Sequence, residues 1–560
     1  MRTVLSGFQM SGLSNHPALS WVQLGWLLLI ACFAFLPGIA GIPVTDRDEG
    51  RFVQASKQMM ETGDYIDIRF QNEPRHKKPA GIYWLQVAAV KTTRALVDGV
   101  DLRDAWPYRI PSFLGALAAV MATACLGARL AGRSAGFLAA LLLIGAIVLQ
   151  AEARIAKTDA VLLATTTTAM LTLARAYVGK IGVGAAAIFW IAAAVSVLVK
   201  GPLILLLAGG AIGALAWADR DLQWLRRMHA AWGLPLFMLL VLPWLIAIYI
   251  VSDGEFYRES LGQDLLGKVF QGQDRGFIPP GAHALLLPVF FWPAALLIAY
   301  ALPDMRARCR EPLIRFLLAW ILPFWTVMEL SFTKLSHYTL PVYPALGLLA
   351  VIAAEGGWDW ARQGRFPLLT KHAPRAWWLV ALATAVATVV VPLLLGLTVS
   401  FLQLFGGLAL LTCASLSLQW LGRDLGRSVM ASVCGSVLFA VTTFGFWLPS
   451  LEPLWISRHV VDIAGREVPG VPRFITVGYR EPSIVFLAGT DTIFANNSEQ
   501  AFDLLRDTPC GVVLERLAGE NGEETPPRLP DTQVIGSFRG FHYNGGGWQK
   551  YILYRSLTTP

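Results

Sequence analysis

The sequence has few charged residues for its length. Aspartate, glutamate, lysine and arginine together make up 15% of the 560 residues, whereas 55% are hydrophobic. Soluble domains are about one quarter charged. The charges are also unevenly spread, because long stretches contain none. This shortage excludes an ordinary soluble enzyme and predicts a protein that crosses a membrane many times.

Cysteine is scarce as well, and the positions of the six cysteines argue against a disulfide framework. Four lie within apolar runs, one lies in a basic connector and one lies alone near the C-terminus, so only the last stands where an oxidising compartment would matter. No basic face interleaved with aromatic residues occurs in a polar segment. The net charge of +8 therefore reflects arginine-rich connectors, and nucleic acid is not an expected partner.

Long apolar runs are what the sequence does have. Runs of about twenty residues, enough to span a bilayer as a helix, recur from residue 21 onward. We predict thirteen spanning helices. They are expected at 21–41, 106–127, 135–150, 160–178, 183–199, 202–218, 231–251, 284–302, 313–331, 339–354, 376–396, 401–421 and 428–449.

The basic residues of the short connectors fall in alternate loops, and this pattern predicts the orientation. Loops rich in lysine and arginine stay in the cytoplasm, so the N-terminus is expected inside. With thirteen spans, the region after residue 450 is then expected on the opposite, outer side of the membrane.

Three stretches stand apart from the spans. The first outward loop, 42–105, shows helix-like spacing of apolar residues and predicts amphipathic helices on the membrane surface. A second long outward loop covers 252–283. From 451 to 560, short β-rich runs alternate with helix-like pieces and turn clusters, which predicts a small α/β domain beside a membrane domain at 1–450.

Charged side chains gather in the outward loops, where they are costly to hold unless they pair or bind a charged ligand. The candidates are Asp48, Glu49, Arg51, Lys77 and Lys78 in the first loop, Arg154, Lys157 and Asp159 in the second, Arg258 in the third, and His337 and Tyr338 in the fourth.

Each group also has a simpler, purely structural interpretation. The acids of the first loop also fit solvated interfacial charges, Arg154 or Lys157 also fits a structural salt bridge with a neighbouring acid, and Tyr338 also fits an interfacial anchor. Lys200 has the position of a helix-end lysine that extends towards water. The Asp46-x-Asp48 pair leaves a divalent metal open.

The placement of these charges favours an enzyme over a carrier. Transporters hold polar groups near the bilayer midplane in broken helices, whereas the middles of these spans are almost free of charge. The residues predict chemistry at the outer leaflet, with the bilayer itself as a partner. A secondary transporter or lipid flippase remains the alternative from another class.

Three motifs give the chain a family resemblance. Asp48-Glu49-x-Arg51 follows the first span, METGDYI comes next, and Lys78-Pro79-x-Gly81-x-Tyr83-Trp84 precedes an amphipathic stretch. Together they resemble the bacterial protein O-mannosyltransferase superfamily. Within it, residues 20–450, including the RESLGQDLLGKV and SHY segments, resemble the 4-amino-4-deoxy-L-arabinose lipid A transferases.

The resemblance implies a fold and an activity. The fold would be GT-C, a mainly α membrane architecture, with amphipathic periplasmic helices and a C-terminal α/β domain. The activity would be inverting transfer of the aminopentose from undecaprenyl phosphate to a lipid A phosphate at the bacterial inner membrane, which confers polymyxin resistance. The alternative is a protein O-mannosyltransferase-like or other envelope glycosyltransferase. No cofactor is implied with certainty.

The resemblance also assigns roles to residues. Asp48 and Asp159 match the acids at the reaction centre, and Lys78 and Tyr338 match groups near the donor phosphate. This chain departs from the superfamily at Phe52, where tyrosine is frequent, and at Lys77, where an acid or aromatic residue is frequent.

Overall fold

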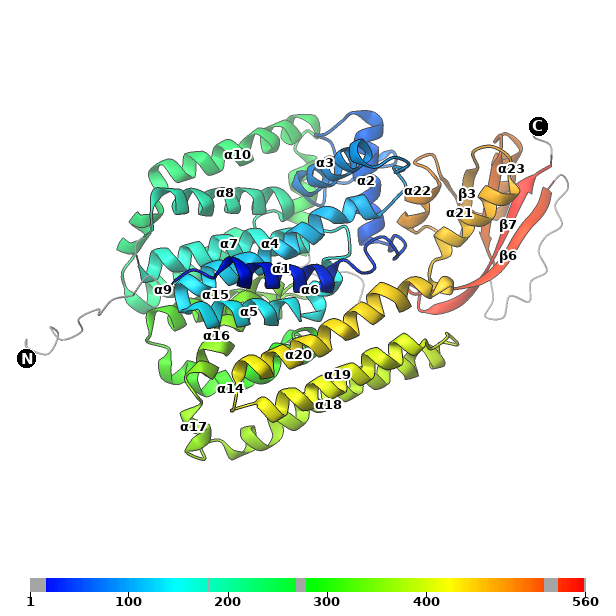
Figure 1. Ribbon diagram of the computed structural model, residues 1–560. Coiled ribbons are helices and arrows are strands. Elements are labelled where there is room, and N and C mark those ends of the chain that lie inside the picture. The colour runs from blue at the N-terminus through cyan, green and yellow to red at the C-terminus, as the bar shows by residue number, and fades with distance from the viewer. Residues whose placement is uncertain (1–16, 180, 268–277, 518–531, 558–560) are drawn as a thin grey trace, which may run out of the picture.

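The structure is a computed structural model that describes residues 17–179, 181–267, 278–517 and 532–557. A large helical bundle adjoins a small domain built on a β-sheet, which lies at the end of the bundle that carries α2 and α3 (Figure 1). Part of the predicted loop 252–283 lies outside the described residues.

The bundle is built from apolar helices. They are α1 (Trp21–Phe35), α4 (Trp106–Ala131), α5 (Arg133–Ile144), α6 (Ile147–Glu152), α7 (Asp159–Val178), α8 (Val183–Lys200), α9 (Leu203–Asp219), α10 (Ala230–Val251), α13 (Ala282–Phe290), α14 (Trp292–Arg308), α15 (Pro312–Leu330), α16 (Tyr343–Glu355), α17 (Asp359–Arg362), α18 (Pro367–Leu394), α19 (Phe401–Trp420) and α20 (Leu425–Ala440).

Each predicted span corresponds to helix, and the prediction of a multi-pass membrane protein is confirmed. In the described part of the chain, eight helices are long and apolar enough to cross a membrane, and four further apolar helices are shorter. The span expected at 284–302 is divided between α13 and α14 at Phe291, beside two prolines that interrupt the helical hydrogen bonds. Thirteen complete spans therefore stay a prediction.

The first outward loop forms the two amphipathic helices that its pattern predicts, α2 (Asp48–Thr62) and α3 (Gly81–Leu96). Two acids in the first turn stabilise the beginning of α2, because their negative charges lie at the positive end of the helix dipole. Gly63 ends α2 in a left-handed conformation. Between the helices, β1 (Arg69–Phe70) and β2 (Glu73–Pro74) form a short hairpin.

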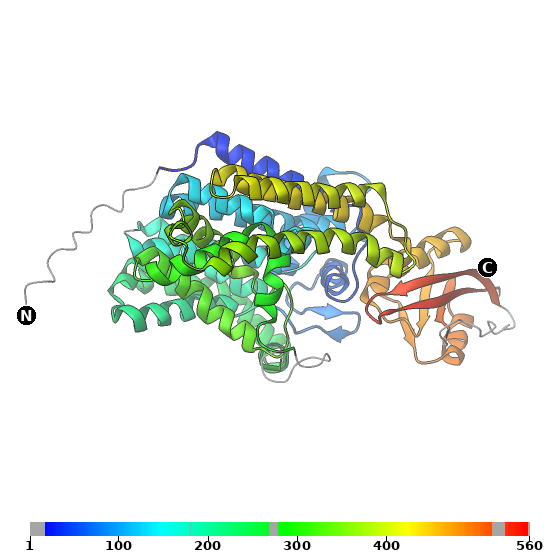
Figure 2. The ribbon, with the colours of Figure 1, turned by 90° about the horizontal axis from the view of Figure 1, so that it is seen from below.

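The polar segment after α10 also folds against the bundle. It contains a short helix, α11 (Glu255–Tyr257), followed directly by a wider helical turn at Arg258–Leu266. This segment carries Asp264, which is buried and pairs with Lys78 of the first loop. Figure 2 shows the blue β1–β2 hairpin of that loop between the bundle and the sheet domain.

The C-terminal region has the predicted α/β character. It comprises α21 (Ile456–Glu467), β3 (Arg473–Val477), α22 (Pro482–Ala488), β4 (Ile493–Ala495), α23 (Ser498–Arg506), β5 (Gly511–Arg516), β6 (Thr532–His542) and β7 (Gly547–Ser556). The strand order is β4-β3-β5-β7-β6, parallel among β4, β3 and β5 and antiparallel at β7 and β6. Apolar clusters cover both faces of this sheet.

The C-terminal domain packs on the first outward loop through α22 and α2. A Cβ on Gly50 would lie 2.9 Å from the backbone nitrogen of Ser483, so only glycine permits this approach. Lys57 donates to the carbonyl of Phe486 at 3.1 Å, and the hydroxyl of Ser483 donates to the carboxylate of Asp46. The loop is thus held between the bundle and the sheet domain.

Candidate active site

A cavity opens where the outward loops meet above the bundle. Its polar part, of about 650 Å³, is lined by Asp48, Arg51, Phe52, Arg75, Lys77, Lys78, Lys157, Thr158, Asp159, Lys200, Asp264, Leu335, His337 and Tyr338. An adjoining apolar hollow of about 620 Å³ shares Lys78, Lys200, Asp264, His337 and Tyr338 and continues along Leu162, Leu203 and Met328. Residues from all four outward loops therefore face one space.

Helix packing explains why distant charges meet there. The helices α7 and α8 are consecutive and antiparallel, so the first residue of α7, Asp159, lies beside the last residue of α8, Lys200. The Nζ of Lys200 is 2.5 Å from Oδ1 of Asp159. Each charge also stands at the helix end that its sign favours.

The start of α3 brings the first loop onto the same corner. A Cβ on Gly81 would lie 2.6 Å from the carbonyl oxygen of Leu198, so glycine permits α3 to touch the end of α8. This contact holds Lys78, three residues earlier, close to Lys200 at the rim of both hollows. The Nζ of Lys78 is 2.6 Å from Oδ2 of Asp264.

His337 and Tyr338 complete the wall from the fourth loop. The imidazole of His337 has Nδ1 3.5 Å from Glu152 and Nε2 3.7 Å from Asp159. Burial lowers the pKa of His337 to about 3, which leaves the ring neutral at pH 7. Lys200 lies 5.8 Å from the centre of the Tyr338 ring, a cation–π distance that keeps this cation at the cavity.

Most of the predicted site residues are brought together. The cavity collects Asp48, Arg51, Lys77, Lys78, Lys157, Asp159, His337 and Tyr338 from the sequence-based set. Their roles in binding and catalysis stay predictions, because geometry alone assigns no step to them.

Three predicted residues lie elsewhere, and the structure assigns them other environments. Glu49 is fully buried beneath the cavity against Arg109. Arg154 is also buried, and its guanidinium donates to the carbonyls of Pro37, Gln150 and Ala34. Arg258 is exposed and does not line either hollow. Glu49 and Arg154 therefore have structural partners in this structure, and their part in substrate binding stays a prediction.

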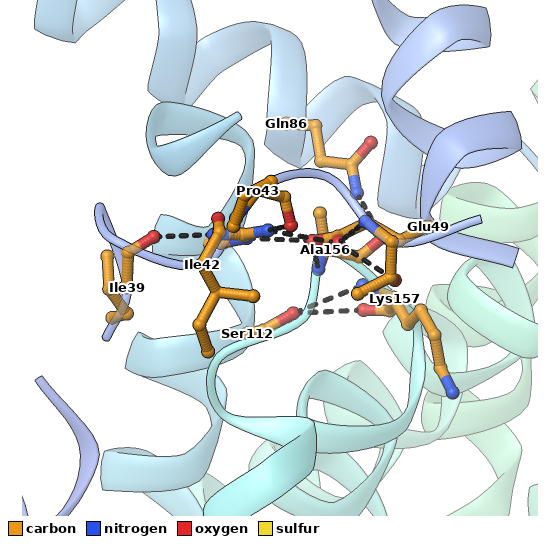
Figure 3. A network of polar contacts seen from close by, with 10 residues as sticks. Ile39, Ile42, Pro43, Glu49, Gln86, Ser112, Ala156 and Lys157 are labelled. Atoms are coloured by element: carbon orange, nitrogen blue, oxygen red, sulfur yellow. Dashed lines mark hydrogen bonds and ion pairs between the residues drawn. The ribbon is translucent and has the colours of Figure 1, made fainter. Parts of the chain in front are cut away.

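The network around Glu49 fixes two loops to each other (Figure 3). Arg109 donates to both carboxylate oxygens of Glu49, at 2.8 and 3.0 Å. Glu49 in turn accepts from the backbone N–H groups of Thr45 at 2.8 Å and Ala156 at 2.9 Å. In the same view, Ser112 bonds the backbone of Lys157. The catalytic candidate Asp48 and the binding candidate Lys157 are thereby held by neighbouring residues of one network.

Sequence reasoning missed several residues that build the site. Arg75 and Asp264 line the cavity, and Arg109 supports it, although none of them was a candidate. Lys200 was interpreted as a helix-end anchor, but its side chain is largely buried against Asp159. A signal existed for Arg109, because an arginine in the first turn of an apolar helix needs an acidic partner.

The open question of a metal has a partial structural answer. Asp46 bonds Ser483 in the sheet-domain contact, whereas Asp48 lines the cavity, so the Asp46-x-Asp48 pair is divided between two environments. Among the described residues, no group of three or more His, Cys, Asp or Glu side chains could hold a metal ion.

Apolar helices that carry charged outward loops over one end, with a cavity where those loops meet, define a GT-C fold. The class predicted from the sequence is confirmed at the level of the fold.

Comparison with known proteins places the chain more closely. Residues 81–246 match the family described as dolichyl-phosphate-mannose-protein mannosyltransferase. An uncharacterised protein of Aquifex aeolicus is 26% identical over 333 residues, which cover 58% of this chain and 72% of that protein. The family match agrees with the resemblance seen in the sequence, over residues 81–246.

Two solved structures share the fold. ArnT from Cupriavidus metallidurans, bound to undecaprenyl phosphate, superposes with a TM-score of 0.74 at 17% identity, over 96% of this chain and 98% of that one. The oligosaccharyltransferase of Archaeoglobus fulgidus superposes with a TM-score of 0.53 at 12% identity, over 88% of this chain and 69% of that one.

Proposed function

We propose that the protein is a glycosyltransferase that moves a sugar from a polyprenyl phosphate to lipid A at the periplasmic face of the inner membrane. The observation that supports it most is the cavity itself, which joins a charged hollow to an apolar one. A lipid-linked sugar phosphate has the same two parts. The similarity to ArnT, whose structure holds undecaprenyl phosphate, supports the donor class.

In this proposal the shared rim of the two hollows holds the donor phosphate. Lys78 and Lys200 line both hollows, so their ammonium groups can bind the phosphate while the prenyl chain lies along Leu162, Leu203 and Met328. When the bond between C1 of the sugar and the phosphate oxygen breaks, the electron pair goes to that oxygen. Fixed cations near it stabilise the departing charge without rearrangement.

Asp48 lines the polar hollow from the first turn of α2. For a hydroxyl acceptor it would take the proton as the acceptor oxygen attacks C1. A lipid A phosphate is already ionised, so Asp48 would then orient the acceptor or bind a cationic amino sugar. Asp159, bonded to Lys200, positions that lysine beside the phosphate.

We further propose 4-amino-4-deoxy-L-arabinose as the sugar and inversion at C1 as the outcome. The test is mass spectrometry of lipid A from a host that lacks its own transferase and expresses wild type, Asp48→Asn, Lys78→Ala or the control Lys91→Ala, an exposed lysine of the same loop. The wild type and the control should add one aminopentose, and the other two should not. No added mass with folded wild-type protein would exclude the lipid A assignment.

A second candidate has its own support. The family description that matches residues 81–246 names a protein mannosyltransferase, so a protein or another envelope glycan is the alternative acceptor. Hexose-modified periplasmic proteins, in the same host and dependent on Asp48, would favour this candidate.

A further inference from the structure

Five of the six lysines and arginines that line the polar hollow fall into two groups that differ in their partners. Three lysines already have a carboxylate: Lys78 pairs with Asp264, Lys200 with Asp159, and Lys157 with Glu152. Two arginines do not. Within the described part of the chain, neither Arg51 nor Arg75 forms an ion pair with a carboxylate, although both line the polar hollow.

Arg75 shows the features of a built binding group. It is only 9% exposed, and its Nε is buried without a hydrogen-bond partner among the described residues. Its guanidinium carbon lies 5.3 Å from the centre of the Phe52 ring, which in turn packs on Tyr83 at 5.4 Å. The backbone N–H of Arg75 also bonds the carbonyl of Ile68 at 2.6 Å, so the residue is fixed at both ends.

A buried arginine of this kind destabilises the fold unless a hydrogen-bond acceptor or an anion binds it. A buried donor without an acceptor, and a charge without a partner, both destabilise a fold by their lost hydration. The buried hydroxyl of Tyr83 lies beside the Arg75 guanidinium, but among the described residues it makes no hydrogen bond of normal geometry. Because Arg75 lines the cavity, its missing acceptor can come from a ligand there.

Arg51, on α2, supports the same inference, whereas Arg75 lies in the loop between β2 and α3. Arg51 lies one turn after Asp48 on α2 and is partly buried. Burial, followed by the charge of Arg75, lowers the pKa of Arg51, although the carboxylates of Asp48 and Glu481 oppose part of the shift. Two guanidinium groups that repel each other beside one cavity are stabilised by an anion between them. Their planar forks suit two oxygens of one phosphate or carboxylate.

We propose that Arg51 and Arg75 form a second oxyanion subsite that binds a phosphate or carboxylate other than the donor phosphate. The two arginines line only the polar hollow, whereas Lys78 and Lys200 line both hollows. The arginine subsite is therefore distinct from the expected donor-phosphate site. The inference rests on the proposed function for the identity of its ligand. The oxyanion belongs either to a phosphate of the acceptor or to a carboxylate of the transferred sugar.

Binding measurements on the purified full chain in detergent test the subsite. The variants are Arg75→Gln, Arg75→Lys and the control Arg94→Gln, which removes an exposed arginine of the same loop. The probes are bisphosphorylated lipid A, dephosphorylated lipid A and undecaprenyl phosphate. A gel-filtration profile like that of wild type establishes that each variant is folded.

For an acceptor phosphate, Arg75→Gln should weaken binding of bisphosphorylated lipid A by about tenfold, the loss of one charged hydrogen-bond donor pair. Arg75→Lys should recover part of this loss. Binding of dephosphorylated lipid A and of undecaprenyl phosphate should stay within about twofold of wild type, as should all binding by the control.

A sugar carboxylate gives a different pattern. Lipid A binding is then unaffected by Arg75→Gln, and the loss falls on a polyprenyl-phosphate uronic acid but not on the same lipid with a neutral pentose. If Arg75→Gln changes neither, or if Arg94→Gln loses as much, the subsite is refuted.

The proposed function can fail separately. A wild type that binds no undecaprenyl phosphate contradicts the glycosyltransferase assignment but not the arginine pair. Inorganic phosphate then serves as the probe: it should raise the melting temperature of wild type and of Arg94→Gln, and not that of Arg75→Gln. Equal stabilisation of all three by phosphate would also refute the subsite.

Discussion

The buried ion pair between Glu49 and Arg109 gives a prediction that can be worked through quantitatively. Both side chains are fully inaccessible, and Arg109 also donates to the carbonyls of Ile39, Ile42 and Pro43. Replacing either partner by methionine keeps much of the volume but leaves the other charge buried alone. We expect each single variant to lose about 3–5 kcal/mol.

The double variant should lose much less than the sum of the single ones. With both charges gone, the remaining cost is three carbonyls and two backbone N–H groups without their side-chain partners, at roughly 1 kcal/mol each. The singles would sum to about 8 kcal/mol if they were independent. The pair should therefore show a coupling of about 3 kcal/mol, and the double variant should be about as stable as either single.

The assay is thermal unfolding of the four proteins in one detergent at one scan rate, since membrane proteins of this size unfold irreversibly. Lys91→Met, a substitution at an exposed position of α3, controls for the loss of a charge from the same loop. A double variant that melts far below both singles, by the sum of their shifts, would refute the reasoning that the two charges stabilise each other.

Two further predictions concern the first outward loop. Gly81→Ala should lower the rate of sugar transfer at least tenfold, because a Cβ 2.6 Å from the carbonyl oxygen of Leu198 would move Lys78 away from α8. The control Gly184→Ala, whose Cβ meets open space, should leave the rate unchanged. Equal rates for the two variants would contradict this. Burial, together with Glu481, raises the pKa of Asp46 from 3.8 to about 7, although Ser483, Tyr543 and His542 oppose the shift. A carboxyl whose pKa is raised on folding stabilises below its unfolded value and loses that contribution as the pH rises through about 7. Wild type should therefore melt lower at pH 8 than at pH 5 relative to Asp46→Asn, and parallel melting profiles for the two proteins would count against this.

Much of the fold follows from patterns that the sequence displays directly. Apolar runs of bilayer length can form only helices or closed barrels in a membrane, so the helices of the bundle were predictable from hydropathy. The strands β3, β4 and β5 were predictable because short β-rich runs alternate with turns. The helix α21 was missed, since it has only a narrow apolar face.

The site was predictable in part, for a physical reason. Charge at a membrane edge is rare enough to be noticed, which is how Asp48, Lys78 and Asp159 became candidates. Hydropathy does not reveal which charged side chains face a cavity and which are buried in structural ion pairs. Glu49 and Asp48 are adjacent in sequence, yet one is buried on Arg109 and the other faces the cavity.

The C-terminal domain also helps to position Asp48, because it contacts the residues just before α2. Asp48 lies two residues after Asp46. The carboxylate of Asp46 accepts a hydrogen bond from Ser483, and its backbone N–H donates to the hydroxyl of Tyr543 at 2.7 Å. On the far side, Glu49 is fixed to Arg109 in the bundle. The position of Asp48 is therefore set by two anchors, of which the sheet domain supplies one.

Loosening that anchor should affect turnover more than donor binding. The double substitution Ser483→Ala and Tyr543→Phe removes both hydroxyls, and each lost hydrogen bond costs about 1 kcal/mol, which leaves the domain folded but less firmly docked. We expect the rate of sugar transfer to fall about tenfold, because small displacements of a reacting group are costly. Binding of undecaprenyl phosphate at Lys78 and Lys200 should stay as in wild type. The matched control is Ser498→Ala with Tyr554→Phe, which removes the same two groups from the sheet domain away from α2. If the control loses as much activity, or if donor binding falls with the rate, the sheet domain acts through general stability and not through the placement of Asp48.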